Sequence, residues 1–460
     1  MRYVSTRGSA PALGFADTLL TGLASDGGLY VPAEWPRLRA IEPEAGYAAN
    51  AAAVMAPYVG DDVPATVLDD ICAAAYRTFR HPAVCPLVQI GDDEWLLELF
   101  HGPTLAFKDI ALQVVGRLFD HVLGQRDERV TIVGATSGDT GSAAIDAVAG
   151  RDNVDIVMLY PLGRVSEVQR RQMTTCAAPN VHAVAVEGTF DDCQDLVKAM
   201  FNDVAFRTHH HLSAVNSINW ARVMAQVVYY ATTASLLGER RLTFSVPTGN
   251  FGNVLSGWIA RETGAPIDHL IVGSNCNDIL TRFFDTRTMS IAEVVPTLSP
   301  SMDIQVSSNF ERLLFEMNGR DGGLTAEQLH QLRAAGRLAV EEDQEARWLA
   351  PVFRAARLDD DETLAVMRSV HTETGLLVDP HTAVGIGAAR ARREPGAATV
   401  ALATAHPAKF AEAVERATGV RPVLPDHLAD LLERPERTEQ VPADFAAVQA
   451  VVERVAAARP

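Results

Sequence analysis

The sequence predicts an α/β protein in which open parallel sheets are covered by helices on both faces. Between Trp95 and Phe410, short runs rich in β-branched residues alternate with amphipathic helical stretches. Glycine-containing turns stand between some of these strands and the helices that follow them. A chain of 460 residues is also too long for a single hydrophobic core, so we expect two or three domains.

The expected elements follow one another in a regular order. Apolar runs typical of strands occur at Trp95–Phe100, Val130–Val133, Asp155–Leu159, Val181–Val186, Leu242–Val246, His269–Val272 and Thr399–Ala403. Helical periodicity occurs at Ile110–Phe119, Ser142–Val148, Ser166–Thr174, Phe190–Phe201, Trp220–Leu237, Val254–Arg261 and Thr382–Arg392. Short strands separated by helices pair in parallel, because each helix carries the chain back to the start of the sheet.

Three regions lie outside this alternation. Residues 1–92 form a small leading domain, with helices expected at Tyr47–Tyr58 and Val67–Phe79. The segment 281–379 is mostly helical and is interpreted as an insertion in the larger α/β domain. The tail, 426–460, is rich in Pro and Ala and ends in a short helix.

Some helix ends are marked by their residues. Thr189, with two acids after it, is typical of a helix start. Thr325–Gln328 has the pattern of a capping box. Asp359 or Asp360 is expected to begin another helix, which Gly375 would end.

The composition excludes several classes of protein. A formal net charge of −18 argues against nucleic acid as a main partner, because a phosphate backbone requires a basic surface. The five cysteines show no CxxC spacing, which is typical of reduced thiols in the cytoplasm. No apolar run reaches the length of about 18 residues that a membrane span needs. His209–His211 points in three directions on a helix, so we expect no metal site there.

The most informative stretch is His101-Gly-Pro-Thr-Leu-Ala-Phe-Lys108, which follows an expected strand and opens an expected helix. An isolated lysine is more often a solvated surface residue. At a strand-to-helix junction, however, Lys108 can be partly desolvated, which lowers its pKa and frees its amine to attack a carbonyl.

Two glycine-rich turns are candidate anion sites. Gly134–Gly141 and Pro247–Asn253 each lie between a strand and a helix, where free backbone N–H groups and the helix dipole favour an anion. Neither turn has the GxGxxG or GxxxxGK[ST] spacing, so dinucleotide and Walker-type sites are weak alternatives. A purely structural turn is the other interpretation of each.

A fourth grouping, Ala403-Thr-Ala-His-Pro-Ala-Lys-Phe410, follows the last expected strand, where open sheets bind ligands. Thr404 could hydrogen-bond a ring nitrogen, and Lys409 could face the same crevice. The alternative is that Thr404 only ends the strand and that Lys409 is solvated.

Taken together, these groupings resemble threonine synthase, a family of pyridoxal-phosphate enzymes of the tryptophan-synthase β type, fold type II. The resemblance rests on four motifs in order and on an opening, Met1–Pro32, similar to the family's leading domain. It implies two open twisted sheets with helices on both faces. The implied domains are 1–92, a large cofactor-binding domain from 93–128 and 226–425, a smaller nested domain at 129–225, and the tail.

The resemblance also assigns roles to individual residues. Lys108 matches the lysine that holds pyridoxal 5′-phosphate as a Schiff base, and Thr404 matches the hydroxyl facing the pyridine nitrogen. The loop around the cofactor phosphate is matched by Gly249, Asn250, Phe251, Gly252 and Asn253. The turn near the substrate is matched by Ser137, Asp139 and Thr140, and further candidate ligands of the substrate phosphate are Lys409 and Arg164.

The implied reaction converts O-phospho-L-homoserine and water to L-threonine and phosphate by γ-elimination and β-addition, in a cytoplasmic monomer or weak homodimer. The same motifs would serve a phospho-lyase that releases a 2-keto acid, ammonia and phosphate. They are also compatible with a serine or threonine dehydratase and with a non-catalytic sensor of phosphorylated metabolites on the same fold.

Overall fold

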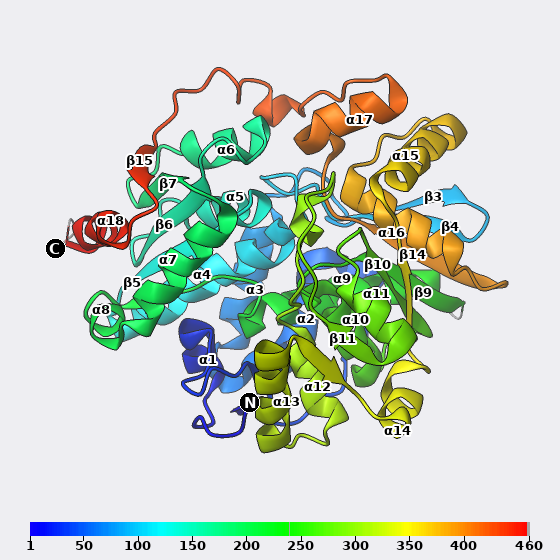
Figure 1. Cartoon of the computed structure of the whole chain (residues 1–460), viewed down its shortest axis with the longest axis horizontal. Coiled ribbons are helices and arrows are strands. Elements are labelled where there is room, and N and C mark those ends of the chain that lie inside the picture. Colours follow the sequence, from blue (N-terminus) through cyan, green and yellow to red (C-terminus); the bar gives the residue numbers. More distant parts are fainter. Residues whose placement is uncertain (239, 458–460) are drawn as a thin grey trace.

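The computed structural model describes residues 1–238 and 240–457. Two largely parallel sheets lie on opposite sides of the molecule in Figure 1, each flanked by helices. This arrangement confirms the predicted α/β class. Within the described residues, no helix is long and apolar enough to cross a bilayer.

The larger sheet has six strands. In spatial order they are β13 (Phe353–Arg357), β10 (His269–Ser274), β9 (Arg241–Pro247), β14 (Ala397–Ala403), β4 (Glu94–Glu98) and β3 (Leu87–Gly91). Neighbours pair in parallel except at β3–β4, which is antiparallel. The carboxyl ends of β9, β14 and β4 are therefore adjacent along one edge of the sheet.

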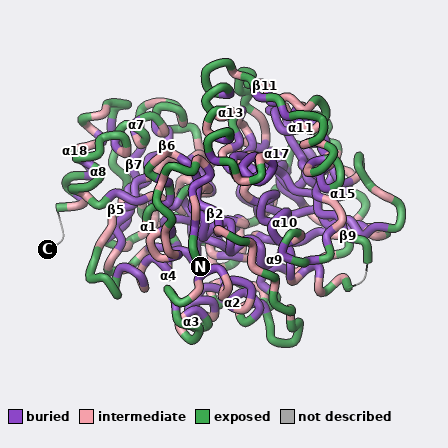
Figure 2. Tube along the Cα trace, turned by 90° about the horizontal axis from the view of Figure 1, so that it is seen from below, coloured by how far each residue is buried: buried purple, intermediate pink, exposed green. Residues whose placement is uncertain are grey.

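Helices cover both faces of this sheet. A Cβ added at Gly257 of α10 (Gly252–Thr263) would lie 2.9 Å from the Leu270 side chain, whereas one added at Gly273 would lie 3.3 Å from Ala388 of α16 (Pro380–Ala391). Leu270 and Gly273 are three positions apart on β10, so they point to opposite faces. Figure 2 shows that α9 (Trp220–Leu237), which packs on α10, is almost wholly buried.

The second sheet is entirely parallel. Its strands, in order, are β15 (Glu439–Pro442), β7 (Val181–Glu187), β6 (Val154–Pro161), β5 (Val130–Ala135) and β8 (Leu212–Ser213). The helices of this part are α5 (Asp139–Val148), α6 (Glu167–Thr174), α7 (Phe190–Asn202), α8 (Val204–His209) and α18 (Phe445–Ala457). Helix α4 (Lys108–Arg126) follows β4 of the large sheet and packs on α5, so it joins the two halves.

The leading region, drawn in blue, lies at the lower left and in the middle of Figure 1. It contains β1 (Tyr3–Ser5), α1 (Phe15–Thr21), β2 (Tyr30–Pro32), α2 (Gly46–Val59) and α3 (Ala65–Tyr76). The hydroxyl of Tyr3 donates to the carbonyl of Tyr58 at 2.7 Å and accepts from the indole of Trp220 at 3.0 Å. These buried bonds anchor the first strand to α9.

The remaining elements lie mostly between β10 and α16. They are α11 (Ile279–Thr286), β11 (Thr288–Ser290), α12 (Phe310–Met317), α13 (Gly322–Ala335), β12 (Arg337–Ala339), α14 (Glu342–Gln344), α15 (Asp360–Thr374) and, after β14, α17 (Ala411–Thr418). Helix α13 is largely exposed (Figure 2). The region is chiefly helical, as predicted.

The structure adds short strands that were not predicted and corrects one expected helix start. Strands β13 and β15 were not predicted, because Phe353–Arg357 carries two arginines in five residues and β15 is a short, mostly exposed edge strand. The predicted capping box at Thr325 is wrong: α13 begins three residues earlier, where Asp321 caps the N–H of Leu324. The predicted helix starts at Thr189 and Asp359 are confirmed, each with a side-chain cap.

Candidate active site

The segment before α4 lies along the end of β14. The Phe107 N–H donates to the Thr404 carbonyl at 2.9 Å, and the His406 N–H donates to the Leu105 carbonyl at 3.0 Å. Leu105 has a φ of 63°, a left-handed conformation that turns the chain into α4. The structure therefore brings Lys108 and Thr404 to the same edge of the large sheet.

Lys108 is the first residue of α4, and its side chain is buried. Its Nζ lies 3.4 Å from Oδ2 of Asp139, the first residue of α5. Burial lowers the pKa of Lys108; Asp139 opposes this shift, and the nearby charges of Lys409 and Arg222 add to it. A buried lysine with a lowered pKa is suited to act as a nucleophile and as a base.

Asp139 is the anion at the centre of this cluster. Its Oδ1 accepts from Gln169 Nε2 at 2.8 Å and lies 2.9 Å from the ammonium of Lys409. Burial alone would raise the pKa of Asp139, but Lys409 and Lys108 outweigh it and hold the pKa well below its usual value. Asp139 is thus a carboxylate, and it only accepts hydrogen bonds.

Lys409 is completely enclosed. Its Nζ donates to the Thr104 carbonyl at 2.7 Å in addition to its pairing with Asp139. The Thr104 hydroxyl and N–H in turn donate to Asp109 at 2.6 and 2.8 Å. Lys409 consequently ties together the loop before Lys108 and the start of α5.

The loop Gly249–Asn253 follows β9 and opens α10. Phe251 has a φ of 63°, and no described side chain caps the helix, so the N–H groups of its first turn face outward from the helix start. A Cβ on Gly249 would lie only 2.7 Å from the Ser301 carbonyl, so only glycine fits here without displacing that segment. Ser307 fixes the loop by donating to the Gly249 carbonyl at 2.7 Å.

Asn253 leaves one polar group without a partner among the described residues. Its Oδ1 accepts from the hydroxyls of Tyr229 and Tyr230, at 2.5 and 2.8 Å. Its Nδ2 is buried and makes no hydrogen bond in the described structure. A buried amide donor beside an uncapped helix start calls for an acceptor, such as an oxygen of a phosphate group.

Thr404 is buried and is held from behind. Its N–H donates to the Thr382 hydroxyl at 3.2 Å, and Thr382 in turn donates to Asp379. Asp379 also pairs with His381 Nδ1 at 2.7 Å and caps the start of α16. This arrangement fixes the strand end that carries the Thr404 side chain.

The other predicted ligands lie in different settings. Ser137 and Thr140 are half-buried at the turn before α5, which is shaped by the N–H groups of Gly138 and Gly141 donating to Thr136. Arg164 is exposed, and the charge near it is Asp192. Arg164 is therefore solvated, whereas the cluster around Lys108 is buried.

Arg222 was missed by the sequence analysis. It is 2% exposed, and one of its terminal nitrogens donates to the Val215 carbonyl at 3.2 Å. Its Nε is buried without a partner, and no acid pairs with it among the described residues. Burial lowers its pKa to about 10. The signal was present in the sequence, since Arg222 is the one charged residue of the 18-residue helix α9.

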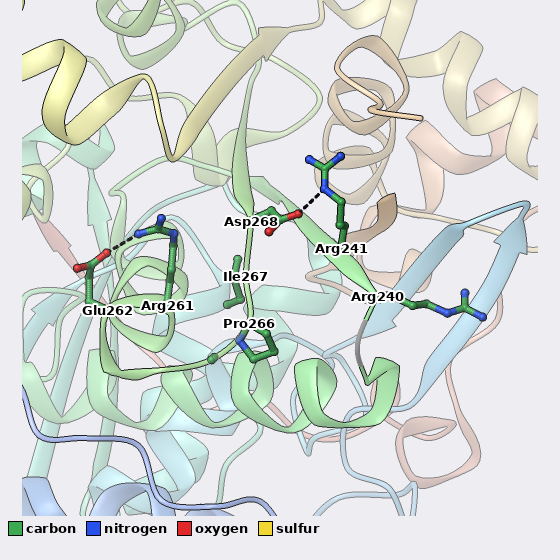
Figure 3. A pocket seen from close by; sticks show the side chains of 8 residues that line it. Arg240, Arg241, Arg261, Glu262, Pro266, Ile267 and Asp268 are labelled. Carbon is green, nitrogen blue, oxygen red and sulfur yellow. Dashed lines mark hydrogen bonds and ion pairs between the residues drawn. The ribbon is translucent and has the colours of Figure 1, made fainter. Parts of the chain in front are cut away.

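A surface hollow of about 480 Å³ lies at the opposite ends of β9 and β10 from this cluster (Figure 3). Figure 3 shows its arginine side chains pointing in different directions. Each has an acidic partner: Arg240 pairs with Asp93, Arg241 with Asp268 and Arg261 with Glu262. The candidate active site is therefore the buried cluster around Lys108, and not this hollow.

The donor set fits pyridoxal phosphate. It offers an amine for the aldehyde at Lys108, an uncapped helix start and the free Nδ2 of Asn253 for the phosphate, and a hydroxyl at Thr404 for the ring. These groups come from the carboxyl ends of three adjacent strands, β4, β9 and β14.

Comparison with known proteins agrees with this fit. A model described as pyridoxal-phosphate dependent enzyme matches residues 86–405. Models described as threonine synthase N terminus and threonine synthase, C-terminal, match residues 2–76 and 382–452. Fold and site therefore define a pyridoxal-phosphate-dependent enzyme of fold type II.

Relatives that match over their full length identify the family more narrowly. The chain is 54% identical to threonine synthase of Pseudomonas aeruginosa, with 98% of each chain covered. It is similar to the crystal structure of threonine synthase from Brucella melitensis with bound pyridoxal phosphate (TM-score 0.96, 51% identity, covering 99% of this chain and 100% of that one). It is also similar to the yeast enzyme (TM-score 0.93, 38% identity, covering 100% and 99%). The chain belongs to the threonine synthase family.

Proposed function

We propose that this protein converts O-phospho-L-homoserine and water to L-threonine and phosphate, with pyridoxal phosphate bound covalently at Lys108. The observation that carries the proposal is the buried Lys108 amine beside Asp139, at the sheet edge that also presents Thr404 and the Gly249–Asn253 loop. Its cysteines are free, which supports a cytoplasmic location. We retain the monomer or weak homodimer as a proposal.

The chain's residues would hold the cofactor at three points. The N–H groups at the start of α10 and the Asn253 amide would bind its phosphate, with Gly249, Asn250, Phe251 and Gly252 forming the loop. The Thr404 hydroxyl would face the ring nitrogen. When bound, the cofactor supplies an electron sink for charge that develops on the substrate's carbons.

Lys108 would carry the protons. Once the substrate's amine has replaced it, its own amine is neutral and can remove and return protons at the substrate's α and β carbons. Asp139 Oδ2, 3.4 Å away, can accept a hydrogen bond from this amine and orient it. Thr404 would face the ring nitrogen as a neutral partner, so it would not hold a proton there as a carboxylate would.

The substrate phosphate needs a cation and hydrogen-bond donors. We propose that Arg222 is that cation, because its buried guanidinium has no acidic partner among the described residues and its charge acts on Lys108. The start of α5, with the hydroxyls of Ser137 and Thr140, would supply the donors. Lys409 is engaged by Thr104 and Asp139, and Arg164 is exposed, so both are less favourably placed.

The test is the variant Lys108→Ala, with the exposed Lys198→Ala as a matched control. Borohydride reduction should fix the cofactor to the parent protein and to the control, but not to Lys108→Ala. Turnover should fall by at least about 10²-fold in Lys108→Ala alone. Substantial turnover by this variant would refute the assignment.

Product analysis tests the reaction itself. Phosphate release accompanied by an equal amount of threonine is expected with O-phospho-L-homoserine. A matching amount of 2-oxobutyrate and ammonia would instead identify a phospho-lyase.

A further inference from the structure

Lysine is rare in this chain, and most of its lysines lie in the candidate active site. Of the 40 basic Lys and Arg residues only three are lysines, Lys108, Lys198 and Lys409, which leaves 37 arginines. Lys198 is exposed and pairs with Asp195 on the surface of α7. The other two are buried and face the same carboxylate.

Each of the two buried lysines contacts a different oxygen of the Asp139 carboxylate. Lys409 Nζ is 2.9 Å from Oδ1, whereas Lys108 Nζ is 3.4 Å from Oδ2. Lys409 is fixed by a second bond, to the Thr104 carbonyl at 2.7 Å, and its side chain is 0% exposed. A compact ammonium suits this enclosed position between two acceptors, where a planar guanidinium would need more room.

The charges around the pair favour a neutral Lys108. Arg222 of α9 and Lys409, which follows β14, are the cations that act on it, and Asp139 of α5 is the anion. His381 of α16 acts on Asp139, and Asp109 of α4 acts on Lys409. If Lys108 were also charged, it would be a buried cation exposed to the charges of both Lys409 and Arg222, with Asp139 as its paired carboxylate.

We propose that Lys409 is a positioning residue for Lys108. By occupying Oδ1 of Asp139, it prevents a close ion pair between that carboxylate and Lys108, and so keeps the Lys108 amine available as the base. This inference rests on the role proposed above for Lys108.

The variant Lys409→Met tests the proposal, because this change should raise the pKa of Lys108 in two ways. Lys108 loses a neighbouring cation, and Asp139 becomes free to pair with it, so Lys108 should hold its proton to higher pH. The three lysines make the measurement simple. Trace acetylation of the cofactor-free full chain across about pH 6 to 11, read by mass spectrometry, follows each lysine, with Lys198 as internal standard.

In the parent protein, Lys108 should become reactive at lower pH than Lys198. In Lys409→Met, its reactivity should shift upward by about one pH unit or more. The acidic limb of kcat for the holoenzyme should shift in the same direction, because Lys108 is a free amine only when the substrate is bound. Lys409→Arg, which keeps the charge, should recover part of both shifts, and Lys198→Met should leave the acidic limb unchanged.

A Lys108 titration that is unchanged in Lys409→Met would overturn the proposal. A rise in KM alone, without that shift, would assign Lys409 to the substrate phosphate instead. If Lys409→Met does not fold, Lys409→Gln keeps a donor for Thr104, removes the charge and should give the same shift. Failure of borohydride to label Lys108 in the parent would instead refute the proposed function, and the acetylation measurement does not depend on that result.

Discussion

At the scale of single residues, the site depends on buried charges that partly cancel. Asp139 keeps its charge because two lysines face it, whereas Asp109, 0% exposed, has hydroxyl and amide donors but no paired cation among the described residues. Burial and the nearby Asp146 raise the pKa of Asp109 to about 7. Two aspartates on neighbouring helices therefore differ in charge at neutral pH because their partners differ.

The raised pKa of Asp109 predicts how stability varies with pH. Between about pH 4 and 7 the folded protein keeps this proton while the unfolded chain releases it, so the contribution of Asp109 to stability falls as pH rises. A shift from 3.8 to about 7 corresponds to roughly 4 kcal/mol. Asp109→Asn, which can still bond Thr104, should flatten this dependence.

The measurement is the thermal midpoint across that pH range for the parent, Asp109→Asn and the exposed control Asp70→Asn. The control should follow the parent. An Asp109→Asn protein with the parent's pH slope would show that another group carries the effect.

At the scale of elements, two helices that begin with reactive residues are packed against each other. α4 begins at Lys108 and α5 at Asp139, and they meet at Gly116. A Cβ at this position would lie 2.5 Å from the Ala147 carbonyl oxygen. The close approach of the helices thus sets the distance between the side chains of Lys108 and Asp139.

Gly116→Ala should push these helices apart, because the clash is with backbone. We expect a loss of about 1–3 kcal/mol in stability and weaker cofactor retention. Gly124→Ala, on the same helix, is the control: its Cβ would meet only Asn153 at 3.5 Å, and it should stabilise by up to about 1 kcal/mol. Denaturant unfolding measures the stability of each variant, and the absorbance of the bound cofactor measures its retention. If Gly116→Ala and Gly124→Ala had the same stability and the same cofactor retention, this account would be contradicted.

At the scale of the whole molecule, the last segment of the chain connects both sheets. After α17 it passes over the site loop, where Leu428 and Leu431 pack on Leu105. It then adds β15 to the second sheet and places α18 on α7, β5 and β6 (Figure 1). This segment is part of both halves and not only a tail.

A substitution at Val452 tests whether α18 stabilises the second sheet. It is 0% exposed and belongs to the apolar cluster that α18 shares with β6 and α7. Val452→Ala should cost about 2 kcal/mol, whereas the exposed Glu453→Ala on the same helix should cost little. If both variants unfold at the same denaturant concentration as the parent, α18 does not contribute to the stability of the second sheet.

The sequence by itself determined the alternation of strands and helices and the order of the turns that carry Lys108, Gly249–Asn253 and Thr404. These are local features: periodicity, β-branched runs and glycines at strand ends act over a few residues. For the same reason β15 escaped prediction, because only its pairing with β7 makes it a strand.

Only the tertiary structure decided which side chains meet. Lys409 reaches Asp139 across 270 positions of sequence, and Arg222 approaches Lys108 from a different helix. Such contacts depend on how two sheets and the helices between them pack, and burial then sets the charge of each group. The pattern of residues therefore predicted the reactive lysine, while the fold decided what surrounds it.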